Sequence, residues 1–188
     1  KNLELEIEKL KDPYEKDGIS KVQTEKIDKL QFKINEKLEN IYSNLDAWQT
    51  TLVARHEDRP KSKTFIDEIF EDFFPLHGDR LFGDDKSLIS GLAKIDGRSV
   101  LVIGQEKGED LDTRIERNFG MMKPEGYRKA IRLMRLADKF NLPVISFIDT
   151  PGAYPGVGAE ERGQAEAIAR SIECSMSIGV PTISIIIG

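Results

Sequence analysis

The residues best suited to chemistry lie in one glycine- and proline-rich stretch, residues 147–164, which reads FIDTPGAYPGVGAEERGQ. Its two prolines stiffen the backbone, while Gly152, Gly156 and Gly158 permit backbone conformations that other residues avoid. Glycines also let a ligand approach main-chain N–H groups without a Cβ in the way. The pattern fits two interpretations: a loop that lines a ligand pocket and offers backbone hydrogen-bond donors, or an ordinary connection between a strand and a helix.

The same stretch contains DTPG, which matches the DxxG pattern of GTPases. A P-loop protein also needs G-x-x-x-x-G-K-[ST], whose amides and lysine hold the phosphates. No Gly-Lys dipeptide occurs anywhere in the chain, and no Asn-Lys-x-Asp for guanine recognition occurs either. The sequence therefore excludes a nucleotide switch of this kind.

The composition of the chain argues against several classes of partner and site. A formal net charge of -5 over 188 residues argues against a nucleic-acid partner, which needs a concentrated basic face. Cys174 is the single cysteine, so the sequence predicts no disulfide framework and no metal site built on several cysteines. No apolar run approaches the roughly 18–20 residues of a membrane span, and no signal peptide is visible. We expect a cytoplasmic protein without a membrane partner.

The N-terminal third has the pattern of helices. A short helix is expected over residues 2–10, followed by a breaker at Asp12, Pro13 and Gly18. A long helix with one apolar stripe is expected next, because the apolar positions recur every three or four residues. The stripe comprises Ile34, Leu38, Ile41, Leu45, Trp48 and Leu52. With so few heptads, packing against the chain's own core or against a partner is favoured over a coiled coil.

The remaining residues alternate strand and helix patterns. TFIDEIFEDFF (64–74) predicts a short amphipathic helix capped by Ser62 or Thr64, and Asp96-Gly97 predicts the turn of a β-hairpin. Helices are expected from Pro124 to Phe140, stopping at Asn141, and from about Ala159 to Ile178. Buried strands are expected at PVISFID and PTISIIIG. The order β-β-α-β-α-β predicts an α/β fold with a mainly parallel sheet, and ligands bind beyond the carboxyl ends of such strands.

Three longer motifs occur in a fixed order: VLVIGQEKG, NFGMMKPEGYRKAIRLMRLADKF and PVISFIDTPGAYPGVGAEERGQAEAIA. From about Asn44 to Gly188 the chain resembles the α subunit of the bacterial acetyl-CoA carboxylase carboxyltransferase, and the first residues resemble it only in helical character. The resemblance implies a crotonase-like fold of β-β-α units. It implies an N-terminal helical extension at residues 1–60 and a carboxyltransferase domain at 61–188. The domain is expected to continue past Gly188, so that the chain is truncated within its core.

The resemblance also implies an α2β2 assembly with active sites between α and β subunits. The reaction moves a carboxyl group from carboxybiotin, on a biotin carboxyl carrier protein, to acetyl-CoA and yields malonyl-CoA for fatty acid biosynthesis. A separate biotin carboxylase would use ATP, and the family's zinc belongs to the β subunit. No metal is expected in this chain.

Site residues follow from the resemblance and the loop. The carboxybiotin pocket is assigned to Gly152, Ala153, Tyr154, Pro155, Gly156 and Gly158. Contacts with CoA phosphates or a carboxylate are assigned to Lys107, Lys123, Arg128 and Lys129, although solvated helix faces would explain the same charges. No catalytic side chain is assigned, because the oxyanion-hole glycines of the family are expected after Gly188. Without them the chain is predicted to be inactive.

Other residues are given weaker or structural roles. Asp149 is expected to brace the loop, and Asn118-Phe119-Gly120 to enter the site. Glu160, Glu161 and Arg162 suit the first turn of the following helix. His56 and His77 receive no catalytic role, and Cys174 is expected to be a buried thiol. Two alternatives stay open: another crotonase-fold acyl-CoA enzyme such as an enoyl-CoA hydratase, which needs a catalytic Glu pair, or a non-catalytic assembly subunit.

Overall fold

The computed structural model describes residues 2–11 and 24–188 of the chain. The expected breaker at Asp12, Pro13 and Gly18 lies outside the described residues. The chain divides into two compact units, residues 1–53 and residues 54–188. The boundary expected between residues 60 and 61 falls inside the second unit. No helix in the described ranges is long and apolar enough to cross a membrane.

The first unit is helical, as expected. It contains α1 (Asn2–Lys11), α3 (Thr24–Ser43) and most of α4 (Ala47–Ala54). The buried apolar side chains among its described residues are Ile7 and Ile34. Because two buried side chains make only a small contact, residues 2–11 and 24–53 form no extended core.

The expectation of one long helix is wrong, because the chain breaks between α3 and α4. The Asn44 side chain donates to the carbonyl oxygen of Asn40 at 2.7 Å, which ends α3. Asp46 then caps α4: the N–H of Gln49 donates to Asp46 Oδ1 at 2.7 Å, and the N–H of Asp46 donates to Gln49 Oε1 at 3.0 Å. This reciprocal pair is a capping box, and it starts a new helix in the middle of the apolar stripe. Trp48 on α4 is exposed.

The second unit is built on a five-stranded sheet in the order β1-β2-β3-β4-β5. The strands are β1 (Glu71–Pro75), β2 (Leu88–Ile95), β3 (Arg98–Gln105), β4 (Val144–Ile148) and β5 (Thr182–Ile186). β1, β2 and β3 pair antiparallel, while β3, β4 and β5 pair parallel. The predicted order from residue 88 onward is confirmed. The sheet is mixed, so the expectation of a mainly parallel sheet holds for β3, β4 and β5 and not for β1 and β2.

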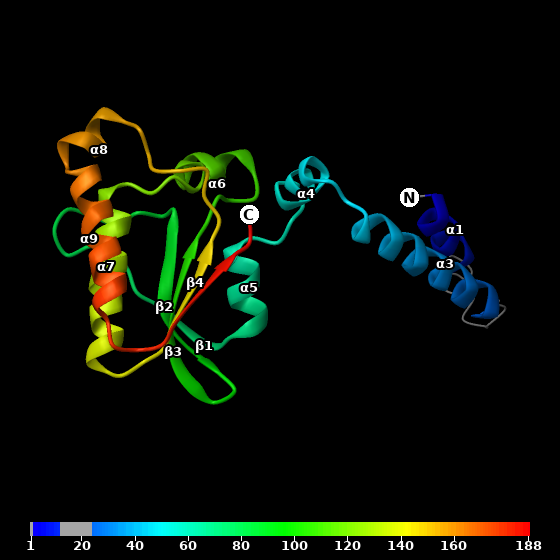
Figure 1. The fold of residues 1–188 in the computed structure, drawn as a ribbon, viewed down its shortest axis with the longest axis horizontal. Helices are drawn as coiled ribbons and strands as arrows, with labels where there is room; N and C mark the ends of the chain where they lie inside the picture. The colour runs from blue at the N-terminus through cyan, green and yellow to red at the C-terminus, as the bar shows by residue number, and fades with distance from the viewer. Residues whose placement is uncertain (1, 12–23) are drawn as a thin grey trace. The chain divides into compact units, whose positions relative to one another are not determined.

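Helices cover the two faces of the sheet (Figure 1). α7 (Pro124–Lys139) and α9 (Gln164–Ser177) pack side by side on one face, where Leu101, Leu133 and Val144 belong to one buried cluster. α5 (Ser62–Ile69) lies on the other face, and its Ile66 packs in a second cluster. Three short elements complete the unit: α6 (Leu111–Glu116), the 3-10 turn η1 (Asn118–Gly120) and α8 (Val157–Glu161).

The hairpin turn forms as predicted. Asp96 and Gly97 both have positive φ, 49° and 73°. Two such residues define a type I′ turn, whose twist matches that of the flanking strands. β2 and β3 therefore pair over their whole length, from Leu88 opposite Gln105 to Ile95 opposite Arg98.

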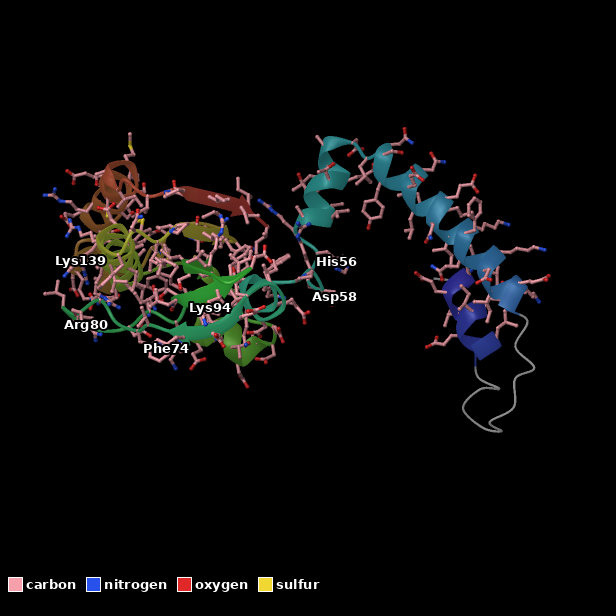
Figure 2. All side chains as sticks on the ribbon, turned by 90° about the horizontal axis from the view of Figure 1, so that it is seen from below. His56, Asp58, Phe74, Arg80, Lys94 and Lys139 are labelled. Atoms are coloured by element: carbon pink, nitrogen blue, oxygen red, sulfur yellow. The ribbon has the colours of Figure 1, made fainter. Side chains whose placement is uncertain are left out.

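The stretch 64–74 is only partly helical, and its expected cap is wrong. α5 ends at Ile69, and the edge strand β1 follows, where Phe74 lies opposite Leu92 of β2. Figure 2 labels Phe74 on this strand. Lys61 precedes the helix and makes no side-chain cap. The Ser62 hydroxyl instead donates to the carbonyl oxygen of Gln105 at 2.5 Å, which pins α5 to the end of β3.

Two further expectations need correction near the C-terminal end. The helix expected from Ala159 is interrupted at Gly163, whose φ of 79° separates α8 from α9. The strand expected to be buried at PTISIIIG is exposed over all five residues of β5. Its position at the sheet edge explains this, since within the described residues it pairs with β4 alone.

Candidate functional site

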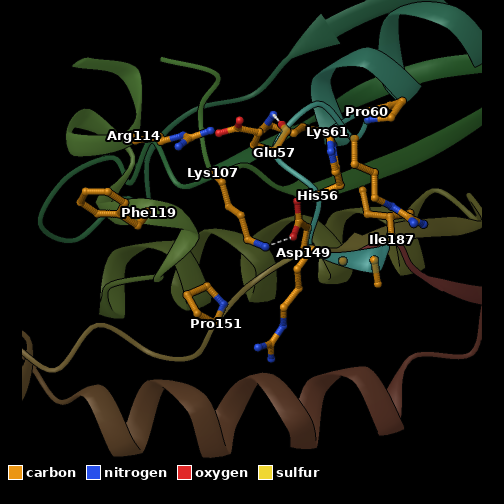
Figure 3. A pocket seen from close by; sticks show the side chains of 14 residues that line it. His56, Glu57, Pro60, Lys61, Lys107, Arg114, Phe119, Asp149, Pro151 and Ile187 are labelled. Carbon is orange, nitrogen blue, oxygen red and sulfur yellow. Dashed lines mark hydrogen bonds and ion pairs between the residues drawn. The ribbon is translucent and has the colours of Figure 1, made fainter. Parts of the chain in front are cut away.

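A cavity of about 280 Å³ lies beyond the carboxyl ends of the parallel strands (Figure 3). Lys107 follows β3, Asp149 and Pro151 follow β4, and Gly188 follows β5. Segment 54–61 closes another side, and Arg114 and Phe119 come from α6 and η1. This is the edge at which ligands bind in open α/β sheets, so the cavity is the candidate site.

The cavity is rich in positive charge. Five cationic side chains line it, against the two carboxylates of Glu57 and Asp149. The cations are Arg55, Arg59, Lys61, Lys107 and Arg114. Arg59 Nε is buried and has no hydrogen-bond acceptor among the described residues. Because the lining carries more cations than carboxylates, the cavity favours a ligand that carries a carboxylate or a phosphate.

Lys107 and Asp149 form an ion pair on the cavity wall. Asp149 is 5% exposed, and its N–H donates to the side-chain oxygen of Gln105 at 3.1 Å. A Cβ on Gly188 would come within 2.6 Å of Asp149 Oδ1, so a larger residue there would displace the Asp149 carboxylate. The geometry suits the expected bracing role of Asp149. It also fixes the Lys107 ammonium at the ends of the strands.

The loop after β3 is held by buried polar contacts. Glu106 is 2% exposed and accepts the N–H groups of Lys63 at 2.8 Å and Gly108 at 2.9 Å. Gly108 has a φ of +84°, and a Cβ there would lie 2.6 Å from backbone atoms of α6. Asp110 caps α6 by accepting the N–H of Thr113 at 2.8 Å, and this bond lowers the pKa of the Asp110 carboxyl. Lys107 therefore projects from a rigid turn.

The predicted pocket residues lie beside the cavity and do not line it. Of the loop 150–158, only Pro151 contributes to the lining. Two of the expected backbone donors are used internally, because the N–H of Gly152 donates to the Thr150 hydroxyl and that of Tyr154 to the carbonyl of Met122. Ala153 forms an isolated parallel bridge with Met122.

The glycines of this loop serve different purposes. Gly152 has a φ of +151° with open space around it. A Cβ on Gly156 would lie 2.2 Å from the ring of Tyr154, so the absence of a side chain at this glycine leaves room for the ring. Gly158 is in α8, where a Cβ would approach Arg162 at 3.0 Å. Pro155 is exposed.

The structure places the four cations that were predicted to contact a ligand in different surroundings. Lys107 lines the cavity, and Lys123 Nζ lies 5.1 Å from the ring centroid of Tyr154. Lys129 is 1% exposed, and its ammonium donates to Asp84 Oδ1 and to the carbonyls of Asp85 and Leu88 at 2.6–2.8 Å. These three acceptors match its three protons, so the structure gives Lys129 a structural role in place of the expected ligand contact.

Arg128 is likewise turned into the protein. Its Nε donates to Asp79 Oδ2 at 2.8 Å, and Nη1 donates to the carbonyl of Arg162 at 3.0 Å. Glu125 accepts from both Arg128 and Arg162, which joins α7 to the end of α8. Arg128 therefore braces these elements, and its expected contact with a ligand stays a prediction.

Segment 54–61 and Arg114 were not predicted as site residues, and His56 lines the cavity although no role was assigned to it. The clustered charges of ARHEDRP were the available signal. Nothing in the local spacing links them to strands about 50 and 90 residues later. Phe119, by contrast, lines the cavity as the η1 segment was expected to do, and Cys174 is buried as expected, which raises the pKa of its thiol.

Within the described residues, no group of three His, Cys, Asp or Glu side chains is placed to hold a metal ion. His77 lies 3.2 Å from Asp84, away from the cavity lining.

The chain has close relatives. A family model described as acetyl co-enzyme A carboxylase carboxyltransferase-like matches residues 1–188. The acetyl-coenzyme A carboxylase carboxyl transferase subunit alpha of Pelagibacter ubique is 73% identical over 188 residues, which is 100% of this chain and 51% of the relative. The subunit of the same name from Zymomonas mobilis is 58% identical over 162 residues, 86% of this chain and 52% of the relative. The chain thus spans about half the length of the curated relatives it matches.

Solved structures share the fold at low identity. The transcarboxylase 12S structure with methylmalonyl-coenzyme A bound has a TM-score of 0.58 at 21% identity, covering 71% of this chain and 24% of that one. A single-chain, multi-domain long-chain acyl-CoA carboxylase has a TM-score of 0.57 at 24% identity, covering 71% of this chain and 13% of that one. These matches confirm the expected crotonase-like carboxyltransferase fold.

Proposed function

This chain belongs to the family of acetyl-CoA carboxylase carboxyltransferase α subunits, and from that membership we propose that it takes part in carboxyl transfer from carboxybiotin to acetyl-CoA, giving malonyl-CoA. The reaction is the committed step of fatty acid biosynthesis. The observation that carries the proposal is the cation-lined cavity at the carboxyl ends of the parallel strands. The biotin carboxylate and the CoA phosphates are all anionic, which suits this lining.

The residues present fit carboxybiotin as a ligand. Arg59, Lys107 and Arg114 line the cavity and supply cationic side chains there. When bound, carboxybiotin would supply the activated carboxyl group from its separate carrier protein. Lys107, oriented by Asp149, would hold an anionic oxygen at the end of β3. Phe119 and Pro151 would exclude water from the same wall.

The glycine-rich loop would supply backbone donors beside these side chains. The N–H groups of Gly152 and Tyr154 are already used, so Ala153 and Gly156 are the donors that we expect to face the ligand. Oriented backbone donors lower the free energy of an oxyanion, and loss of one typically costs about 10²–10³ in rate. The remaining oxyanion donors are expected from residues that follow Gly188 in the family.

The proposed assembly is an α2β2 carboxyltransferase in the cytoplasm. A β subunit would complete the active site, a biotin carboxyl carrier protein would deliver the carboxyl group, and a biotin carboxylase would use ATP to charge it. The names of the curated relatives, each a subunit of an acetyl-coenzyme A carboxylase, support this arrangement.

The test measures the reverse half-reaction, malonyl-CoA-dependent carboxylation of a free biotin derivative. The protein is prepared at the length of its relatives, with and without a carboxyltransferase β subunit. Activity in the mixture alone is the expected result. Activity without the β subunit would indicate a self-contained crotonase-type enzyme, and inactivity in both preparations would indicate a non-catalytic assembly subunit.

A further inference from the structure

The glycine-rich loop gains little from the packing of its own side chains. Pro151, Gly152, Ala153 and Pro155 are exposed. A Cβ on Gly152 would meet no atom within 4 Å. A segment with so few apolar contacts opens locally at low free energy unless polar contacts hold it. The hydrogen bonds that attach this loop to its neighbours therefore determine its conformation.

Gln164 makes the first of these attachments. It is the first residue of α9 and is only 4% exposed. Its Nε2 donates to the carbonyl of Met122 at 2.9 Å and to that of Tyr154 at 3.2 Å. The N–H of Tyr154 donates to the same Met122 carbonyl at 3.0 Å. One buried amide thus joins α9, the loop and the segment before α7.

Thr150 makes the second attachment, at the other end of the loop. Its hydroxyl lies 2.7 Å from the carbonyl oxygen of Gly120 and 2.9 Å from that of Gly152. It also accepts the N–H of Gly152 at 3.1 Å. Gly120 in turn packs on Lys107, because a Cβ there would lie 2.7 Å from Lys107 Cγ. This attachment therefore connects the loop to the cavity wall.

We propose that Gln164 and Thr150 are positioning residues that hold the loop 150–156 in register with segment 120–122 and so orient the N–H groups of Ala153 and Gly156 toward carboxybiotin. This pair is called the loop clamp below. The proposal rests on the proposed function. The clamp also sets the ring of Tyr154 between Gly156 and the ammonium of Lys123.

The kinetic test uses the assembled enzyme with its β subunit and the free-biotin assay. Gln164→Leu and Thr150→Val remove the two attachments, while Thr150→Ser keeps the hydroxyl. We expect kcat/KM for the biotin derivative to fall at least tenfold in the first two, because misplacement by about 1 Å can cost 10²-fold. Thr150→Ser stays within twofold of wild type, as does the KM for malonyl-CoA. Ser175→Ala, at an exposed hydroxyl bonded within α9, is the control.

Amide hydrogen exchange separates the clamp from the proposed function. The Tyr154 amide should exchange at least tenfold faster in Gln164→Leu, with the β4 amides unchanged. An inactive wild-type assembly would refute the proposed function, and the exchange result would still decide the clamp. Wild-type kinetics and exchange in both variants would overturn the clamp. Equal losses in Thr150→Ser and Thr150→Val, or faster exchange throughout β4, would overturn it as well.

Discussion

Asp79 is a buried carboxylate whose pKa is set by its neighbours. Burial by itself would raise the pKa, but the N–H groups of Leu81, Phe82 and Gly83 donate to Oδ1 at 2.8–2.9 Å. Arg128 adds a charged donor to Oδ2 at 2.8 Å. Together these donors lower the pKa of Asp79 to about 2. The charged form is therefore favoured in the folded state.

We predict that Asp79→Asn makes the free energy of unfolding depend less on pH in acid. A carboxylate with a lowered folded-state pKa stabilises the fold fully above its unfolded pKa of about 3.9. That stabilisation is lost as the pH falls from about 4 to about 2. The variant should be about 2 kcal/mol less stable at pH 7 and depend less on pH below 4. Urea unfolding from pH 7 to about pH 2 measures this, with the exposed Asp58→Asn as control. Parallel curves for the variant and wild type would contradict it.

Lys129 gives a second test at the residue scale. Its ammonium donates to two backbone carbonyls and to Asp84. Burial by itself would raise the pKa of Asp84, but the hydrogen bond from Lys129 contributes to a pKa that is lowered overall. Lys129→Met should cost about 3–5 kcal/mol, because it leaves buried acceptors and a partly buried carboxylate without their donor. Urea unfolding at pH 7 measures the loss. Lys86→Met removes an exposed surface pair and should cost under about 1 kcal/mol. Equal effects would show that the Lys129 contacts are dispensable.

The edge strand β1 depends on a glycine in its neighbour. Gly91 of β2 pairs with Pro75, and a Cβ at Gly91 would lie 2.3 Å from the carbonyl oxygen of Phe74. β1 lies at the sheet edge and pairs with β2 alone among the described strands, so a clash at Gly91 would push β1 away from β2. We predict that Gly91→Ala destabilises the protein by about 1–3 kcal/mol and speeds amide exchange in β1. Gly83→Ala, where a Cβ meets nothing within 4 Å, should be near neutral. Unchanged exchange in β1 would contradict the prediction.

Local sequence signals predicted the elements whose ends are defined by particular residue types. The Asp96-Gly97 turn and the helix from Pro124 fall where expected, because positive φ and an N-terminal proline act locally. The break before α4 was missed because the stripe spacing continues through Asp46, whose side chain starts a new helix. β1 was missed because its register depends on β2 and not on residues nearby in sequence.

The candidate site was predictable only in part for the same reason. Its location at the carboxyl ends of the strands follows from the element order. Arg59 and Lys61 line the cavity only because the fold brings their segment beside the ends of the strands. The Lys129 side chain points into the protein, toward acceptors that lie more than 40 residues away in sequence. A cation on a helix has the same sequence signature whether it faces a ligand or a buried carboxylate.

At the scale of the whole chain, the two units differ in how much apolar surface they bury. Both buried clusters belong to residues 54–188, with members on β2, β3 and β4 and on α5, α7 and α9. In the first unit, the described residues 2–11 and 24–53 contribute Ile7 and Ile34 to the buried apolar side chains. Isolated short helices are marginal in water, because helix stability comes mainly from packing. Cooperative unfolding of this chain should therefore report the second unit.

We accordingly predict that the fragment 54–188 unfolds cooperatively with a Tm within about 3 °C of the 188-residue chain. Fragment 1–53 should show partial helicity by circular dichroism and no cooperative transition. A matched cut to 71–188 removes Phe65, Ile66 and Phe70 from the cluster around Phe147, so this fragment should not fold. A fall in Tm of more than about 5 °C for 54–188 would mean that the first unit stabilises the sheet by more than about 1 kcal/mol. That result would overturn the division of stability between the units.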